Sequence, residues 1–351
     1  MKSFALSALT LVMALAFVSC SQVRTINLQR HHFSTHPKQV VWIQVAGLRP
    51  EHLSMLRFNR FDSHQPLSLE SATCIGHVWN YNIYNLRPKA HESFLAQIHG
   101  TKNITNTCDD FASEPFWELL GTEEYRVGIF ETSGQFSYEE KIRECRTQEL
   151  EDSFGVDAYD NAIFWKMTRR TQSENQNSLP TFHYQSSDSF ESGQVYYDQT
   201  CQGPRCFAGV SQNLASLWSR FSPDYQRKIL IVQDYTYLEA LKNQDIQKAR
   251  EILSEIEKAY QYFSDIQKTR SDFLLVLSSA ESMGLEMPSQ GQQWEDFEKS
   301  GSNIIYQRSS LDSVVYAQGA MAENLCGIYE EAEIGRRIPW KVQESRFFLF
   351  N

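Results

Sequence analysis

Five side chains in this sequence are candidate ligands for a divalent metal such as zinc. Histidines and carboxylates hold zinc in hydrolytic enzymes, where the metal activates an oxygen nucleophile. Here the candidates are His77, His91, His99, Asp234 and Glu281. An HExxH zinc motif does not start at His91, because its second histidine would fall at position 95, where the chain has leucine. At least three candidates would have to converge to make a site, and their spacing does not indicate that they do.

Apolar runs of strand length would have to position these side chains. They are VVWIQVA at residues 40–46, YRVGIF at 125–130, KILIVQD at 228–234 and DFLLVL at 272–277. Their apolar and β-branched composition, without a polar face, predicts strands buried on both sides of a parallel sheet. Apolar residues at helical spacing over 245–268 predict a helix that packs on this sheet. The sequence therefore indicates an α/β domain.

The first of these runs ends abruptly at Ala46 and Gly47. Glycine permits a sharp turn, and Pro50 followed by Glu51 can begin a helix. Functional side chains in open α/β sheets project at the carboxyl ends of such strands, so position 46 is where one is expected. Alanine can neither bind a metal nor react, and the expected functional group is therefore missing.

Residues 40–50, VVWIQVAGLRP, resemble the first strand of the alkaline phosphatase superfamily, which includes phosphatases, sulfatases, phosphodiesterases and phosphoethanolamine transferases. In that family an aspartate that binds a catalytic metal precedes glycine and often Leu-Arg-Pro. This chain keeps GLRP at 47–50 but has Ala46 in the aspartate position. The resemblance implies a three-layer α/β fold, with a mostly parallel central sheet between helices, in a single domain over residues 38–351.

Residues 86–100, LRPKAHESFLAQIHG, are similar to the helix that carries the family's nucleophile. That nucleophile is Thr, Ser or Cys before a proline or a small residue. Aligned in this way, Arg87 takes its place, and Ser93 is an alternative in another register. Because arginine cannot attack a phosphorus or sulfur centre, the first alignment implies that the nucleophile is lost.

Two later strand ends depart from the family's metal ligands. In many members the third strand ends in an aspartate with a histidine a few residues later, whereas here Asp234 is retained and YTYL follows at 235–238. The run SDFLLVLSSAESMG at 271–284 resembles the family's strand that ends in Ser-Asp-His-Gly, in which Asp and His bind metal. Ser279 and Ala280 replace these two ligands, and Glu281 comes one position late.

The C-terminal run at 309–338 resembles the end of alkaline phosphatases, where a strand ending in Val-Tyr-Ala precedes a Gly-x-Tyr segment and a last helix. Counting back from this frame, Arg308 occupies the position of the family's last metal-binding histidine. Together with Ala46, Arg87, Ser279 and Ala280, this makes five degenerate positions. We therefore predict a pseudoenzyme without a bound cofactor, which acts as a binding or structural module.

These substitutions leave other hypotheses open. If Arg87 and Arg308 both reach the site, their guanidinium groups could replace the positive charge of the metals and hold a phosphate or sulfate group. In the simpler interpretation, the two arginines make ordinary surface or carboxylate pairs. An active phosphatase, sulfatase or phosphoethanolamine transferase would instead need a relocated zinc site, built from the five candidate ligands named above.

The N-terminus is typical of a bacterial lipoprotein signal. Lys2 precedes an apolar stretch over residues 4–18, which is followed by Ser19 and Cys20. We expect a signal peptide over residues 1–19, a lipid on Cys20, and a polar tether over 20–37. These features predict an exported protein held by its lipid in the bacterial periplasm or at the outer membrane, where an anionic ligand or an envelope protein could be its partner. The net charge of −10 and the lack of a dense basic stripe argue against nucleic acid.

Six further cysteines predict disulfides, because their number is even and the chain is expected to be exported. They are Cys74, Cys108, Cys145, Cys201, Cys206 and Cys326. Six cysteines allow 15 pairings, and the turn sequence QGPR makes the pair Cys201 and Cys206 the best local one. No pair has the CxxC spacing of a zinc site, which favours structural bridges. The polar stretch at 171–198 is expected to be a surface insertion.

Overall fold

The computed structural model describes residues 36–57, 66–121, 125–132, 138–147, 154–160, 162–166, 193–194, 209–221, 226–288 and 291–339. These residues belong to one compact unit, Thr35–Trp340. The predicted signal peptide, the lipidation site Cys20, the pair Cys201 and Cys206, and nearly all of the insertion at 171–198 lie outside the described residues.

The strands of the described chain form a nine-stranded sheet and a separate two-stranded hairpin. In chain order they are β1 (Gln39–Ala46), β2 (Cys74–Trp79), β3 (Arg126–Glu131), β4 (Ile163–Lys166), β5 (Gly193–Gln194), β6 (Lys228–Asp234), β7 (Phe273–Ala280), β8 (Met283–Glu286), β9 (Ile305–Ser309), β10 (Asp312–Gly319) and β11 (Gly327–Glu330). The sheet has the order β11-β2-β10-β7-β1-β6-β3-β4-β5, and β8 pairs with β9. Strand β10 runs antiparallel to both of its neighbours, and the other pairings in this sheet are parallel. The predicted mostly parallel sheet is confirmed.

The helices of the described residues lie between these strands in the chain. The α-helices are α2 (Ser54–Arg57), α3 (Ala90–His99), α4 (Tyr138–Thr147), α5 (Phe154–Asp157), α6 (Val210–Arg220), α7 (Thr236–Lys242), α8 (Ile246–Lys268), α9 (Gly291–Ser300) and α10 (Glu333–Arg337). Short 3-10 helices are η2 (Pro50–Leu53), η3 (Leu69–Ser71), η4 (Cys108–Phe111), η5 (Glu118–Leu120) and η6 (Ala322–Leu325). Among these described helices, none has both the length and the apolar character needed to cross a membrane.

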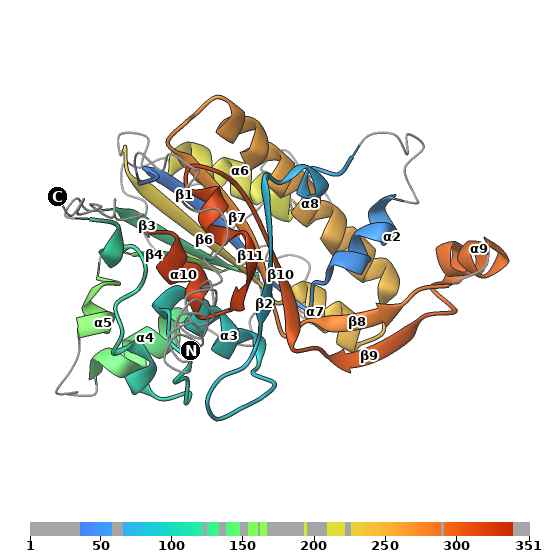
Figure 1. Cartoon of the computed structure of the whole chain (residues 1–351), viewed down its shortest axis with the longest axis horizontal. Helices are drawn as coiled ribbons and strands as arrows, with labels where there is room; N and C mark the ends of the chain where they lie inside the picture. The colour runs from blue at the N-terminus through green and yellow to red at the C-terminus, as the bar shows by residue number, and fades with distance from the viewer. Residues whose placement is uncertain are drawn as a thin grey trace, which may run out of the picture. The chain divides into compact units, whose positions relative to one another are not determined.

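Side chains of the central strands alternate between two apolar cores, one on each face of the sheet. In β1, Val41, Ile43 and Val45 belong to one core, whereas Val40 and Trp42 belong to the other. The first core also contains side chains from α6, α7 and α8, and the second contains side chains from α3, α4 and α10. Figure 1 shows α8 along one face, and α3, α4 and α10 on the opposite face. The three-layer arrangement predicted above is therefore confirmed.

Most of the predicted elements are present. The apolar runs at 40–46, 125–130, 228–234 and 272–277 form β1, β3, β6 and β7, and the helical pattern at 245–268 forms α8. The helix that the resemblance implies within residues 86–100 is α3, and it ends at Gly100, whose φ of 64° is left-handed. Strand β2 and the β8–β9 hairpin, with α9 between its strands, were not predicted. Figure 1 shows this hairpin projecting from the end of the sheet with α9 at its tip.

Two disulfides join segments that are distant in the sequence. Cys74 at the start of β2 is bonded to Cys326, which follows η6, and Cys108 of η4 is bonded to Cys145 of α4. The first bridge spans a sequence separation of 252 residues and holds β2 beside the segment that leads into β11. The prediction of structural disulfides is confirmed for these four cysteines.

Candidate functional site

The carboxyl ends of β1, β6 and β7 lie side by side at one edge of the sheet. Ala46, the last residue of β1, pairs with Ala280 at the end of β7, and Val45 pairs with Asp234 at the end of β6. The chain then turns at Gly47, whose φ of 90° favours glycine. Strand register therefore gathers positions 46, 234 and 280, where the resemblance implies metal ligands.

An apolar cluster fills the space beyond these strand ends. Its members come from β1, α3, α7 and β7, and they are Ala46, Ala90, Phe94, Leu238 and Ala280, with Tyr235 and Met283 packed against them. Ala46 and Ala280 are fully buried. A Cβ atom built at Gly47 would lie 3.0 Å from the Cα of Leu238, so α7 packs directly on the turn. Aliphatic side chains offer no ligand atom to a cation, and the strand ends therefore do not fit zinc or magnesium.

Asp234 stands where the resemblance implies a metal ligand. Here its carboxylate accepts hydrogen bonds from within the protein. The side chain is buried and accepts hydrogen bonds from the hydroxyls of Thr132 at 2.8 Å and Thr236 at 3.0 Å. It also accepts one from the backbone N–H of Tyr237 at 2.9 Å, in the first turn of α7. Asp234 thus anchors the helix that places Leu238 in the apolar cluster.

Neutral polar side chains occupy the layer between these strands and α3. Gln44 of β1 accepts a hydrogen bond from Gln233 of β6 at 3.0 Å and donates one to Gln97 of α3 at 3.1 Å. Gln97 also donates to the carbonyl oxygen of Ser279 at 3.0 Å. The hydroxyl of Ser279 accepts a hydrogen bond from the backbone N–H of Val314 at 2.9 Å. Ser279, which stands where the resemblance implies an aspartate, therefore links β7 to β10.

Ser93, the alternative nucleophile, is buried within α3. It has no exposed surface, and its hydroxyl donates a hydrogen bond to Oε1 of Glu331 at 3.2 Å. Burial raises the pKa of Glu331 to about 8, although hydrogen bonding from Ser93 acts in the opposite direction. This carboxyl group is therefore mostly neutral at pH 7. A fully buried hydroxyl cannot meet a substrate, so this structure does not present Ser93 as a nucleophile.

The three histidines of the candidate metal set do not come together. His99 is buried, with Nδ1 at 2.5 Å from the carbonyl oxygen of Ser113 and Nε2 at 2.8 Å from the hydroxyl of Tyr159. Burial lowers the pKa of His99 to about 4, which keeps the ring neutral. The rings of His91 and His77 contact an amide oxygen and a carboxylate oxygen of other segments. Within the described ranges, no three His, Cys, Asp or Glu side chains are grouped so that they could hold a metal ion.

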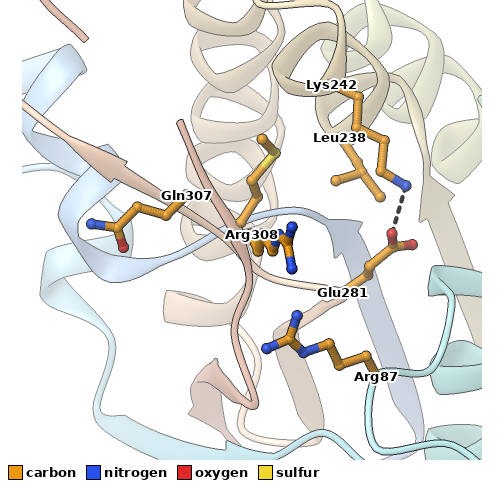
Figure 2. Close-up of a pocket in the computed structure, with 7 residues that line it drawn as sticks. Arg87, Leu238, Lys242, Glu281, Gln307 and Arg308 are labelled. Atoms are coloured by element: carbon orange, nitrogen blue, oxygen red, sulfur yellow. Dashed lines mark hydrogen bonds and ion pairs between the residues drawn. The ribbon is translucent and has the colours of Figure 1, made fainter. Parts of the chain in front are cut away.

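A cavity of about 260 Å³ lies next to the closed strand ends. It is lined by side chains from the segment before α3, from α7, and from the β8–β9 hairpin. Arg87 and Arg308 both line it, together with Lys242 and Glu281. Figure 2 shows the guanidinium groups of the two arginines directed toward the same space, with Lys242 and Glu281 at another side. The structure thus brings together the two arginines that the sequence suggested as an anion site.

Glu281 connects this cavity to the start of α3. Its Oε1 lies 2.5 Å from Nζ of Lys242, and its Oε2 accepts a hydrogen bond from the backbone N–H of Ala90 at 2.9 Å. The Glu281 side chain is only 14% exposed, compared with 54% for Lys242. A carboxylate of the chain itself therefore stands at the N-terminus of α3, where the helix favours negative charge.

Four residues that line the cavity were missed in the sequence. Leu238 and Lys242 lie on α7, Met283 begins β8, and Gln307 lies on β9. The two hairpin strands are short, and α9 lies between them in the sequence. No local sequence pattern therefore indicates that they pair. Lys242 could have been suspected only once Glu281 was known to face α7.

Comparisons with known proteins identify similar structures. No protein-family model matches the sequence, and no curated protein matches it. The chain is similar to the cold-active alkaline phosphatase of Shewanella sp., with 11% identity, a TM-score of 0.62, and coverage of 86% of this chain and 98% of that one. The Thermus thermophilus alkaline phosphatase gives 11% identity, a TM-score of 0.60 and coverage of 87% and 91%.

The alkaline phosphatase of the Antarctic bacterium TAB5 is a further similar structure. It shares 14% identity with this chain, has a TM-score of 0.58, and the match covers 87% of this chain and 98% of that one. At identities this low, the similarity concerns the fold. Together with the sheet order and the two helical layers, it shows that this chain has an alkaline-phosphatase-like fold.

Proposed function

We propose that this protein is an exported, lipid-anchored protein that does not catalyse metal-dependent hydrolysis. It uses the alkaline-phosphatase-like fold as a binding or structural module of the cell envelope. The observation that carries this proposal is the apolar cluster at the carboxyl ends of β1, β6 and β7.

This cluster lies where hydrolysis would require metal ligands. Two-metal phosphoryl or sulfuryl transfer needs carboxylates and imidazoles that converge on ions about 4 Å apart. Ala46, Leu238 and Ala280 supply only aliphatic carbon at this point, and the carboxylate of Asp234 is held by hydroxyl and amide donors. A neighbour could compensate for one lost ligand, but the loss of several together argues against a metal site at these strand ends.

The nucleophile position supports the same conclusion. Arg87, which stands there in the alignment, cannot form a covalent phosphoryl or sulfuryl intermediate. Ser93 has the required hydroxyl but no exposed surface. A relocated zinc site would be the basis of the alternative, active enzyme, and the described part of the chain does not assemble the candidate ligands for it.

Export and lipid attachment are supported by the N-terminal sequence, in which an apolar stretch precedes Ser19 and Cys20. Mass spectrometry of the N-terminal peptide from the membrane fraction would test this part of the proposal. We expect diacylated Cys20 as the first residue, and we expect the Cys20→Ser protein to leave the membrane fraction. An unmodified Cys20 would contradict lipid anchoring.

The test of the catalytic proposal is a hydrolysis assay on the purified protein with zinc and magnesium. Aryl phosphate, bis-aryl phosphate and aryl sulfate esters cover the three hydrolytic chemistries of the superfamily. We expect no turnover above the buffer rate. Turnover that is lost both on chelation and in the Asp234→Asn variant would contradict the proposal, because it would show a working metal site in this chain. Turnover that the variant retains would indicate a contaminating enzyme.

A further inference from the structure

We propose that the cavity between Arg87 and Arg308 binds a phosphate or sulfate group directly, without a metal. This inference rests on the proposed function and names the ligand class of the binding module. The group would be held by guanidinium hydrogen bonds at a position displaced from the apolar cluster toward the β8–β9 hairpin.

The cavity has an excess of positive charge. Three cations, Arg87, Lys242 and Arg308, line it with one carboxylate, Glu281, which is paired with Lys242. This leaves two positive charges without a counter-charge, in a protein whose overall net charge is −10. The local excess therefore does not reflect a generally basic surface, and it matches a dianion.

Neither Arg87 nor Arg308 lies within ion-pair distance of a carboxylate in the described ranges of the chain. Other arginines do, such as Arg57, which lies 2.7 Å from Glu70, so the chain has carboxylates to pair with arginines elsewhere. Two guanidinium groups without an ion-pair partner are directed into one cavity (Figure 2). Guanidinium forks donate paired hydrogen bonds to tetrahedral oxyanions, so this arrangement is suited to phosphate or sulfate.

The size and walls of the cavity leave room for an ester as well as for a bare ion. Its volume of about 260 Å³ equals roughly nine water molecules at about 30 Å³ each, which exceeds the space that one tetrahedral oxyanion needs. Leu238 and Met283 supply an apolar wall. A phosphate or sulfate ester could place its anionic group on the arginines and its organic part on these apolar side chains.

Calorimetric titration of the purified protein tests this proposal, with glycerol 1-phosphate, inorganic phosphate and inorganic sulfate as probes and with a chelator present. We expect saturable binding that weakens as salt is added. Arg87→Ala and Arg308→Ala should each weaken it about ten-fold or more, because each removes charged hydrogen bonds to the anion. Arg143→Ala is the matched control, since Arg143 is 71% exposed on α4 and pairs with Glu139. It should bind as the unaltered protein does.

A second experiment distinguishes two sources of the phosphate group, a lipid headgroup and a soluble ester. Sedimentation with phosphatidylglycerol vesicles, compared with phosphatidylcholine vesicles, would be measured for the Cys20→Ser protein and its Arg87→Ala form. Vesicle binding that requires Arg87 supports a lipid headgroup as ligand, and binding of glycerol 1-phosphate alone supports a soluble ester. If no probe binds, or if Arg87→Ala and Arg308→Ala bind like Arg143→Ala, the proposal is wrong.

Titrations with chelator and after addition of zinc distinguish failure of the anion-site proposal from failure of the proposed function. Anion binding that appears only after zinc is added would contradict the metal-free site and would also point to a metal centre. An absence of anion binding in protein that retains no metal would contradict the anion site alone, and the non-catalytic proposal would stand.

Discussion

The carboxylate of Glu281 accepts a hydrogen bond from the backbone N–H of Ala90 at 2.9 Å, although the two residues are 191 positions apart in the sequence. This contact joins the end of β7 to the first turn of α3. Glu281 adopts a left-handed φ of 44°, which is uncommon for a residue other than glycine, asparagine or aspartate. The same carboxylate pairs with Lys242, so a side chain of the protein supplies the negative charge at this helix end.

Glu281→Ala should lower the free energy of unfolding by about 1–2 kcal/mol, because it removes an anionic acceptor from the start of α3. Loss of the ion pair with Lys242 adds little, since Lys242 is more than half exposed. Chemical denaturation measures the change. The control is Glu286→Ala on β8, an exposed glutamate, which should have little effect. If the two variants are equally stable, the Glu281 contact does not stabilise α3.

Ala46→Asp tests whether the apolar cluster retains a latent metal site. Position 46 is fully buried beside Leu238 and Ala280, so a carboxylate there would be buried without a partner. We expect a loss of about 3–5 kcal/mol in the free energy of unfolding, which zinc does not restore. Ala46→Asn, which has the same shape but no charge, should lose less, on the order of 1–3 kcal/mol. A large zinc-dependent gain in the stability of Ala46→Asp would show that neighbouring ligands are already in place.

The buried carboxyl group of Glu331 should make the protein less stable as the pH rises from about 4.5 to about 8. Burial raises the pKa of this carboxyl to about 8 in the folded protein, from its ordinary value of 4.5. Between these two values the unfolded chain has released the proton and the folded chain keeps it, so the free energy of unfolding falls as pH rises. The slope is at most about 1.4 kcal/mol per pH unit for one group, and the loss is complete above the folded pKa.

Glu331→Gln should flatten this dependence and make the protein more stable than wild type near pH 8. Unfolding midpoints measured from pH 5 to pH 9 would show the change. Glu251→Gln on α8, where the side chain is 69% exposed, is the control and should keep the wild-type slope. Equal slopes for Glu331→Gln and the wild type would mean that Glu331 is ionised in the folded state.

The central strands and the longest helix could be predicted from the sequence because their signals are local. Strands β1, β6 and β7 are apolar runs buried along their whole length, and α8 repeats its apolar residues over 23 positions. Strand β2 was missed because alternate residues are exposed and two of its six residues are glycine and histidine. The β8–β9 hairpin was missed because its stability depends on pairing between strands separated by a helix.

The site could be predicted only in part, because some of its contacts depend on how distant segments pack together. Ala46 and Asp234 follow directly from where their apolar runs stop, whereas Ala280 lies three residues beyond the end of the run at 272–277. The contact between Leu238 and Ala46 depends on how α7 packs on the sheet. The ion pair between Lys242 and Glu281 depends on the same packing. Contacts of this kind are set by tertiary structure and leave no pattern in the sequence near either residue.

The metal content of the protein shows whether its strand ends can hold zinc. The purified protein would be exposed to excess zinc, freed of loosely bound ions by gel filtration, and analysed for elements, with an alkaline phosphatase treated in parallel. Because aliphatic side chains fill the strand ends, we predict no stoichiometric zinc in this protein, while the alkaline phosphatase retains its metal. Retention of one or more zinc ions per chain would contradict the account and would indicate a metal site that could support hydrolysis.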